Sequence, residues 1–222
     1  YNSIIEAVAT GASRFTEISG KINEETSKCA SYMKNLQEIR VINKQIPYGE
    51  NANSKKSIYS LSDPFFRFWY KYVFSNTSTL SVLGAKDYTD KIINDIPSVL
   101  GSAFEEICTQ YLTMMARKKK LPFIPNGFGR CWGNNPTKKS QDDVDILGID
   151  GNKGIFCECK FRNGKFDLAE FNDLICASNI FTDITERYYY IFVKSGYTQA
   201  VINESEKYNV RLLTFDDLFN ID

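Results

Sequence analysis

The stretch GIFCECKFRNGK, residues 154–165, constrains this chain most, because it has the pattern of a buried strand yet carries an acid and a base. Side chains alternate across a strand, so one face holds Ile155, Cys157, Cys159 and Phe161. The other face holds Phe156, Glu158, Lys160 and Arg162. A carboxylate and an ammonium lose hydration in a half-buried strand, so they need each other or a ligand. The fold must therefore place this strand where Glu158 and Lys160 contact either each other or a ligand.

Short strands and helices alternate around this stretch. Two helices are expected over residues 86–120, and three strands follow over residues 129–134, 142–150 and 154–161. After them the pattern predicts a helix, a strand, a helix, a strand and a short helix. This order predicts one mixed sheet flanked by helices.

Residues 1–62 have a different layout: two short helices, a polar turn, a longer helix and two strand-like segments. This order is typical of a winged helix-turn-helix domain. In the third helix the apolar residues at three-residue spacing are expected to share the buried face: Ala30, Met33, Leu36 and Ile39. Such a helix can lie in a major groove of DNA, and the polar residues that it and the wing would offer are Lys28, Ser31, Lys34, Asn35, Lys55 and Lys56. Because Glu24, Glu25, Glu38 and Glu50 lie close to these lysines, protein contacts or a spacer role are the alternative.

Asp63-Pro64 marks the start of a helix that is crowded with aromatic residues. Its rings could stack nucleobases, but rings on all sides of a helix are more typical of packing. We therefore predict an α+β chain with three parts: a winged helix-turn-helix over residues 1–62, a helical, aromatic-rich connector over 63–96, and an α/β domain over 97–222.

Composition limits the chemistry. The 222 residues include no histidine, which excludes histidine-based triads, histidine-containing zinc sites and an imidazole pH switch. Catalysis would have to use carboxylates, lysine, water and a metal ion. The six cysteines form no Cys-x-x-Cys pair and fit a reducing cytoplasm. Without a signal peptide or an apolar run near 18 residues, we expect a cytoplasmic protein with no membrane partner.

Two carboxylates are expected to meet at one end of the predicted sheet. Asp145 and Glu158 lie on neighbouring strands, and the short turn IDGNKG between them indicates an antiparallel hairpin. Carboxylates at close range raise each other's pKa unless a cation lies between them, and hard oxygen ligands suit Mg²⁺ or Mn²⁺. Lys160 is on the same strand face as Glu158, roughly 7 Å further along. The sequence therefore predicts a metal site with an ammonium beside it.

Three motifs carry a resemblance to a known superfamily. GSAFEEI, DDVDILG and CECK resemble motifs one, two and three of the PD-(D/E)XK superfamily, which has the restriction-endonuclease-like fold. The wider layout, from YSLSDPFFRFWYKYV to GIFCECKFRN, resembles the C-terminal region of archaeal-type, AAA-related ATPases. In that family a winged helix follows the nucleotide-binding domain, and a nuclease-like domain of uncertain function ends the chain.

The resemblance implies roles for particular residues. Asp145 and Glu158 would be metal ligands, Lys160 the catalytic lysine, and Glu105 the acid of the preceding helix and a further metal ligand. Glu106 is the alternative to Glu105, which we prefer because it directly follows Phe104. Asp143 would support the ligands from the same strand face.

Local charge indicates a phosphate-rich ligand. Residues 116–165 carry eleven Lys and Arg against five Asp and Glu, although the net charge of the whole chain is zero. The residues expected to contact a nucleic-acid backbone are Lys118, Lys119, Lys120, Arg130, Lys138, Lys139 and Arg162.

These features give two functional hypotheses. The first is a Mg²⁺- or Mn²⁺-dependent DNA phosphodiesterase, and the alternative is an inactive DNA-binding or protein-interaction module that regulates an ATPase. The chain begins at Tyr1 and has no P-loop motif, so we expect the ATPase domain upstream in a longer polypeptide and no ATP binding within these residues. DNA and that domain are the expected partners, and a homo-oligomer stays open.

Overall fold

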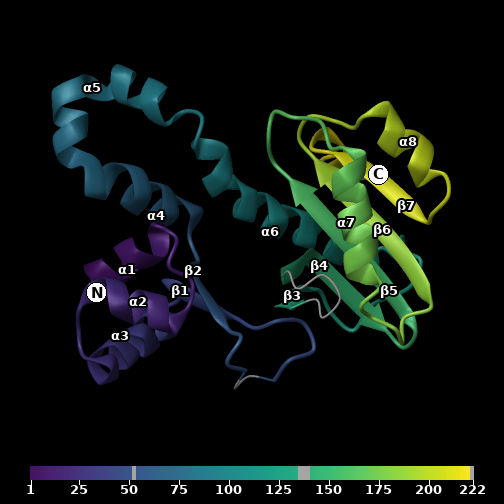
Figure 1. The fold of residues 1–222 in the computed structure, drawn as a ribbon, viewed down its shortest axis with the longest axis horizontal. Coiled ribbons are helices and arrows are strands. Elements are labelled where there is room, and N and C mark those ends of the chain that lie inside the picture. Colours follow the sequence, from purple (N-terminus) through teal and green to yellow (C-terminus); the bar gives the residue numbers. More distant parts are fainter. Residues whose placement is uncertain (52–53, 135–140, 221–222) are drawn as a thin grey trace. The chain divides into compact units, whose positions relative to one another are not determined.

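The chain divides into two compact units in a computed structural model that describes residues 1–51, 54–134 and 141–220. One unit comprises Tyr1–Ile46 and Glu50–Val99, and the other comprises Pro47–Gly49 and Leu100–Asp222 (Figure 1). The finer division into parts at residues 62 and 96 stays a prediction.

The first unit begins with three helices and a small sheet. The helices are α1 (Asn2–Ala9), α2 (Phe15–Ile22) and α3 (Thr26–Glu38). Strands β1 (Ile42–Gln45) and β2 (Ile58–Leu61) follow and pair antiparallel, with Ile42 opposite Leu61. The predicted order of elements in this part of the chain is therefore confirmed.

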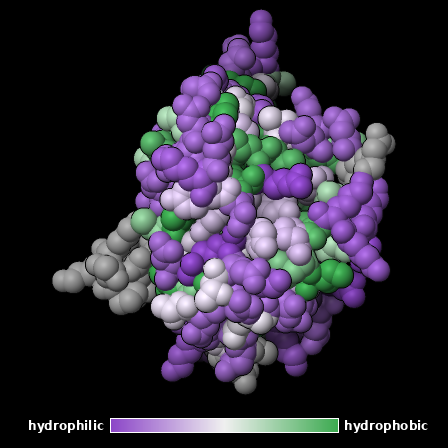
Figure 2. All heavy atoms as spheres, turned by 90° about the vertical axis from the view of Figure 1, so that its right-hand side faces the viewer, coloured by the Kyte–Doolittle hydropathy of each residue, from purple (hydrophilic) through white to green (hydrophobic). Residues whose placement is uncertain are grey.

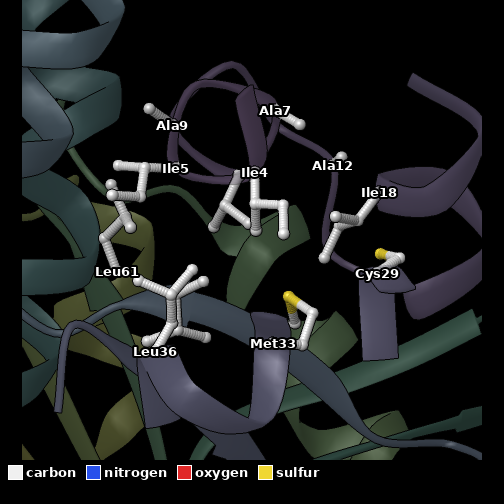
Figure 3. Packing of buried hydrophobic residues seen from close by; sticks show 12 residues of the cluster. Ile4, Ile5, Ala7, Ala9, Ala12, Ile18, Cys29, Met33, Leu36 and Leu61 are labelled. Carbon is white, nitrogen blue, oxygen red and sulfur yellow. The ribbon is translucent and has the colours of Figure 1, made fainter. Parts of the chain in front are cut away.

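The core of this unit lies between the three helices and the sheet (Figure 3). From α3 it takes Cys29, Met33 and Leu36, which are almost completely buried. The prediction that Ala30 and Ile39 share this face was wrong, since Ala30 is exposed and Ile39 is 68% exposed. A helix has 3.6 residues per turn, so successive three-residue steps drift around the axis, whereas steps of four and then three stay on one side.

The aromatic-rich segment forms a broken helix. It begins as α4 (Pro64–Phe68), continues through a π-helical turn (Trp69–Val73) and a 3₁₀ turn (Phe74–Asn76), and ends as α5 (Thr77–Ile92). The carboxylate of Asp63 accepts a hydrogen bond from the Phe65 backbone N–H at 2.8 Å, and Pro64 occupies the first helical position. The predicted helix start is therefore confirmed.

The aromatic side chains of this segment are less buried than predicted. Tyr72 is buried and donates a hydrogen bond from its hydroxyl to Asp95 at 2.7 Å. Four others are exposed, namely Phe65, Phe66, Trp69 and Phe74. These four rings are therefore not part of the core of the first unit, and their packing against another domain stays a prediction.

The second unit is built on a five-stranded mixed sheet. Helix α6 (Ile96–Arg117) precedes β3 (Gly129–Asn134), β4 (Gln141–Asp150) and β5 (Lys153–Lys160). Then come α7 (Leu168–Ser178), β6 (Glu186–Val193), α8 (Gln199–Ser205), β7 (Val210–Thr214) and a 3₁₀ turn (Asp216–Leu218). The strand order is β3-β4-β5-β6-β7; β3, β4 and β5 pair antiparallel, and β5, β6 and β7 pair parallel. This confirms the predicted mixed sheet with helices.

Helices cover both faces of this sheet (Figure 1). Phe104, Cys108 and Leu112 of α6 pack on one face, in the cluster that contains Ile155, Cys157 and Cys159 of β5. The other face carries α7 and α8, and Phe156 of β5 belongs to that cluster. The predicted alternation of β5 is therefore confirmed. Figure 2 views the molecule from the side where α8 and β7 lie, and its surface there is mostly hydrophilic.

The residues Pro47–Gly49 belong to this second unit and fix the start of β3. The backbone N–H of Tyr48 donates to the carbonyl of Arg130 at 2.8 Å. Its hydroxyl accepts a hydrogen bond from the N–H of Ile149 at 3.2 Å, and a Cβ at Gly129 would lie only 3.1 Å from its ring. Tyr48 thus holds β3 and β4 from the edge of the sheet.

Among the described residues, no helix has the combination of length and apolar character that a membrane crossing requires.

Gly148 tests the packing between β4 and the loop before β3. A Cβ at this position would lie 2.8 Å from the Phe128 ring and 3.1 Å from Pro125, so Gly148→Ala should overpack the site. We expect the free energy of unfolding to fall by about 1–3 kcal/mol, measured by urea denaturation. Gly127→Ala is the matched control, because nothing lies within 4 Å of a Cβ there. Equal stability of the two variants would contradict this packing.

Candidate metal and catalytic centre

A β-bulge in β4 places Asp145 at the centre of the candidate site. Gly129 lies opposite Leu147 and Cys131 opposite Val144, so two residues, Asp145 and Ile146, oppose Arg130 alone. Val144 and Leu147 consequently both pack beneath α7, although residues three apart in a regular strand point to opposite faces. Ile146 packs beneath α6 instead. The bulge therefore changes the direction of the side chains just where the acidic residues lie.

The predicted hairpin between β4 and β5 is present. Asp150 pairs with Lys153 across a two-residue turn in which Gly151 has a φ of +56°. The antiparallel pairing extends to Ile146 opposite Cys157, so Asp145 and Glu158 are the next residues on the two strands. The carboxylate of Asp145 accepts a hydrogen bond from the Cys159 backbone N–H at 2.8 Å. Asp145 is thereby fixed across the end of the hairpin.

Arg130 lies among three carboxylates that come from α6 and β4. Its Nε and Nη2 donate to the two oxygens of Asp143 at 3.2 and 2.5 Å. Its Nη1 lies 3.4 Å from Glu105, and its Nη2 lies 3.8 Å from Asp145. This guanidinium supplies the positive charge on the α6 side of the site.

Glu158 and Lys160 form the second half of the site. The ammonium of Lys160 donates to Glu158, so the polar pair of β5 does contact each other. Burial and the nearby Asp145 carboxylate raise the pKa of Glu158 to about 8. Burial works in the opposite direction on Lys160, but Glu158 and Asp145 outweigh it and raise the pKa of the lysine. Near neutral pH Lys160 therefore keeps its proton, while the pKa of Glu158 lies close to the ambient pH.

Glu105 is the acid of α6 that reaches the site. Its side chain is half-buried beside Arg130, whereas Glu106 is exposed. Burial, followed by repulsion from Asp145, raises the pKa of Glu105 to about 7. Burial also raises the pKa of Asp145, against the opposing effects of the Cys159 N–H and Arg130. The pKa values of Glu105 and of Glu158 thus both depend on Asp145.

The donor set has the chemistry of a hard-cation site. Carboxylate oxygens are the ligands that Mg²⁺ and Mn²⁺ prefer, and burial together with the neighbouring carboxylates raises the pKa values of these carboxyl groups. Within the described part of the chain, however, no group of three or more Asp, Glu, Cys or His side chains has the arrangement of a formed metal site. In this structure the counter-charges are Arg130 and Lys160, and side-chain movement would be needed to exchange them for a metal ion.

The residues predicted to contact nucleic acid, as far as the structure describes them, do not gather in one place. Lys118, Lys119 and Lys120 are exposed at the end of α6, roughly 20 Å along the helix axis from Glu105. Arg162 is paired with Glu170 at 2.6 Å, close to the end of β5. Arg130 contacts carboxylates, and Lys138 and Lys139 lie outside the described residues. Their contacts with DNA stay predictions.

In the first unit, three of the four predicted DNA-facing lysines have acidic partners. Lys28 pairs with Glu24 at 2.8 Å, and Lys56 pairs with Glu50 at 2.6 Å. Lys34 lies 3.8 Å from Glu38. Exposed pairs of this kind are weak, so they reduce the local positive charge without preventing another contact.

Sequence reasoning missed two contributors to the site. Arg130 was predicted to contact DNA rather than carboxylates, and Tyr48 falls within residues 1–62, the range predicted for the winged helix-turn-helix. The sequence does contain a sign of the bulge that positions Arg130. Val144 and Leu147 are both apolar at a spacing of three, which does not fit the alternation of a regular strand. No signal in the sequence connects Tyr48 with residues 129–149.

Comparisons with known proteins relate this chain to uncharacterised proteins. Residues 69–172 match the sequence model of the DUF234 family, described as "Archaea bacterial proteins of unknown function". The chain is also similar to "Uncharacterized protein MJECL04" of Methanocaldococcus jannaschii, at 31% identity over 199 residues. That alignment covers 87% of this chain and 44% of the relative, so the chain spans less than half the length of that protein. No solved structure matched the chain. The matched family segment contains every residue of the carboxylate cluster and both of its cationic partners.

The raised pKa of Glu105 makes a prediction about stability. Folding raises the pKa from 4.5 to about 7, so the folded state binds this proton more tightly. The resulting stabilisation is complete below pH 4.5 and is lost as the pH rises through 7. Glu105→Gln should remove this loss, which amounts to at most about 3 kcal/mol between pH 4.5 and 8.

The measurement is the free energy of unfolding of wild type and variant across this pH range. Glu106→Gln is the matched control, because its side chain is the exposed neighbour on the same helix. Identical pH profiles for wild type and Glu105→Gln would show that Glu105 is not buried beside Asp145.

Proposed function

We propose that the second unit is a PD-(D/E)XK nuclease-like domain and a Mg²⁺- or Mn²⁺-dependent DNA phosphodiesterase. The observation that carries this proposal is that Asp145 of β4 lies close to both Glu105 of α6 and Glu158 of β5, and that Lys160 is paired to Glu158. Those four residues are the ones that the three motifs of the superfamily would supply. The order of the elements, a helix before an antiparallel hairpin in a mixed sheet, is compatible with that fold.

Each residue has a task in this chemistry. Asp145 and Glu158, with Glu105, would hold a divalent cation, which would neutralise the carboxylates and polarise the phosphodiester. The Cys159 N–H orients one oxygen of Asp145 and leaves the other toward Arg130. Lys160 keeps its proton because of its raised pKa, so it can donate a hydrogen bond to a phosphate oxygen as negative charge develops there.

DNA would approach along the cationic segments that follow the carboxylates in sequence. Lys118–Lys120 at the end of α6 are too far from Glu105 to touch the same phosphate, but roughly 20 Å is about six base-pair steps of a duplex. Arg162 lies two residues after Lys160 and would contact a phosphate close to the reacting one. These contacts position the backbone and carry no base specificity.

We also propose that the first unit is a winged helix and that the chain acts together with an ATPase domain of the same polypeptide. The layout of three helices and a two-stranded sheet supports the first point, and the resemblance to archaeal-type ATPases motivates the second. A tethered domain would raise the local concentration of DNA or of a partner at the candidate site.

A second candidate is a DNA-binding module without catalysis. It is favoured by the counter-charges in the structure, because Arg130 and Lys160 already pair with the carboxylates that a metal ion would need. Salt-sensitive DNA binding without cleavage, unchanged in Asp145→Asn, would identify this alternative.

The phosphodiesterase proposal predicts that Asp145→Asn abolishes metal-dependent cleavage. We expect at least about a 100-fold loss of Mn²⁺-dependent cleavage of plasmid and branched DNA, together with loss of Mn²⁺ binding in calorimetry. Asp150→Asn, at the exposed end of the same strand, should behave as wild type. Cleavage that persists in EDTA, or that survives in Asp145→Asn, would refute the proposal.

The lysines at the end of α6 give an independent test of DNA binding. Replacing Lys118, Lys119 and Lys120 with glutamine should lower the slope of log K against log salt by about 2–3. The affinity for Mn²⁺ should stay the same, because these residues lie roughly 20 Å from Glu105. An unchanged salt slope would remove this segment from the interface.

A further inference from the structure

We propose that Arg130 is a built-in counter-cation of the carboxylate site, which competes with the divalent metal ion and must leave before the metal binds. This inference rests on the proposed metal site and adds a control step to it. The guanidinium contacts Asp143 and Glu105 and lies 3.8 Å from Asp145, so it occupies space that a cation shared by these carboxylates would take.

The backbone geometry gives this role to Arg130 rather than to a neighbour. Arg130 is the single residue opposite the two-residue bulge at Asp145 and Ile146, which brings its side chain to the acidic residues of β4 and to α6. Its carbonyl accepts the hydrogen bond from Tyr48, so the main chain is fixed at this point. Exchange with a metal ion therefore requires movement of the side chain alone.

Arg130 contacts Asp143 more closely than it contacts Glu105 and Asp145, and this difference defines how its side chain would move. Two hydrogen bonds join it to Asp143, at 3.2 and 2.5 Å, whereas its contacts with Glu105 and Asp145 are 3.4 and 3.8 Å. Asp143 is also the more exposed carboxylate, at 40% of its side chain against 10% for Asp145. Arg130 can thus swing outward while it keeps its fork on Asp143, and Glu105 and Asp145 are then released to a metal ion.

The positive charge of Arg130 determines whether its removal strengthens or weakens metal binding. A guanidinium within 4 Å of two prospective ligands repels a divalent cation and also occupies their oxygen atoms. Lys160 does not have the same position, because its ammonium donates to Glu158 on the β5 side. Removal of Arg130 should therefore strengthen metal binding, whereas loss of a ligand would weaken it.

The test is a calorimetric titration of Mn²⁺ into wild type, Arg130→Gln and Lys153→Gln, without DNA. We expect Arg130→Gln to bind Mn²⁺ about tenfold more tightly or better. Lys153→Gln is the matched control, since it also removes one positive charge but lies at the opposite end of β5, paired with Glu186. It should bind Mn²⁺ as wild type does. Equal or weaker binding by Arg130→Gln, in a variant with a native circular dichroism spectrum, would overturn the inference.

A second measurement uses the wild-type protein and does not depend on how the variant folds. Phenylglyoxal modifies accessible arginines, and peptide mapping by mass spectrometry follows Arg130 separately from Arg162. We expect saturating Mn²⁺ to increase the reactivity of Arg130 several-fold, while the reactivity of Arg162 changes little. Mn²⁺ binding with unchanged reactivity of Arg130 would overturn the inference.

The two proposals fail in different ways. If wild type binds Mn²⁺ and cleaves DNA but Arg130→Gln shows no gain in affinity, the role of Arg130 is wrong and the phosphodiesterase proposal stands. If neither protein binds Mn²⁺, the metal site itself is wrong, and the counter-cation role falls with it.

Discussion

The structure of the second unit depends on one electrostatic constraint, which is the negative charge gathered around Asp145. Its carboxylate is almost buried, and it repels Glu105 on one side and Glu158 on the other. Buried carboxylates of like charge are unfavourable unless protons, cations or hydrogen bonds compensate them. Here the Cys159 N–H, Arg130 and Lys160 supply that compensation. A fold that only needed stability could replace these groups with apolar ones, so their presence favours a ligand-binding role.

Local chain geometry builds this cluster from distant residues. The two-residue hairpin at Gly151 brings β4 and β5 together, and the bulge opposite Arg130 turns Asp145 toward α6. The apolar face of α6, with Phe104 and Cys108 in the core, fixes the neighbouring Glu105 beside the strands. Tyr48 holds the backbone of β3 next to the same point. Packing on both faces of the sheet therefore determines where the charges lie, while side-chain rotation of Arg130 decides which cation they meet.

Much of this unit could be predicted from the sequence, because its signals are local. Alternation placed Cys157 and Glu158 on opposite faces of β5, and the turn at Gly151 indicated the hairpin. The bulge could not be predicted in the same way, since it depends on how two strands pair. The position of Arg130 and the docking of Tyr48 depend on tertiary contacts. In the first unit the three-residue spacing of Ala30 and Ile39 does not predict burial, because a helix rotates away from such a pattern.

The most direct test of the account is a crystal structure of the protein soaked in Mn²⁺, with an anomalous difference map recorded at a wavelength where manganese scatters. The account predicts an anomalous peak between Asp145, Glu158 and Glu105, with the guanidinium of Arg130 moved away from Glu105 and Asp145. A map without a peak at these carboxylates at saturating Mn²⁺, and with Arg130 in its present place, would contradict it.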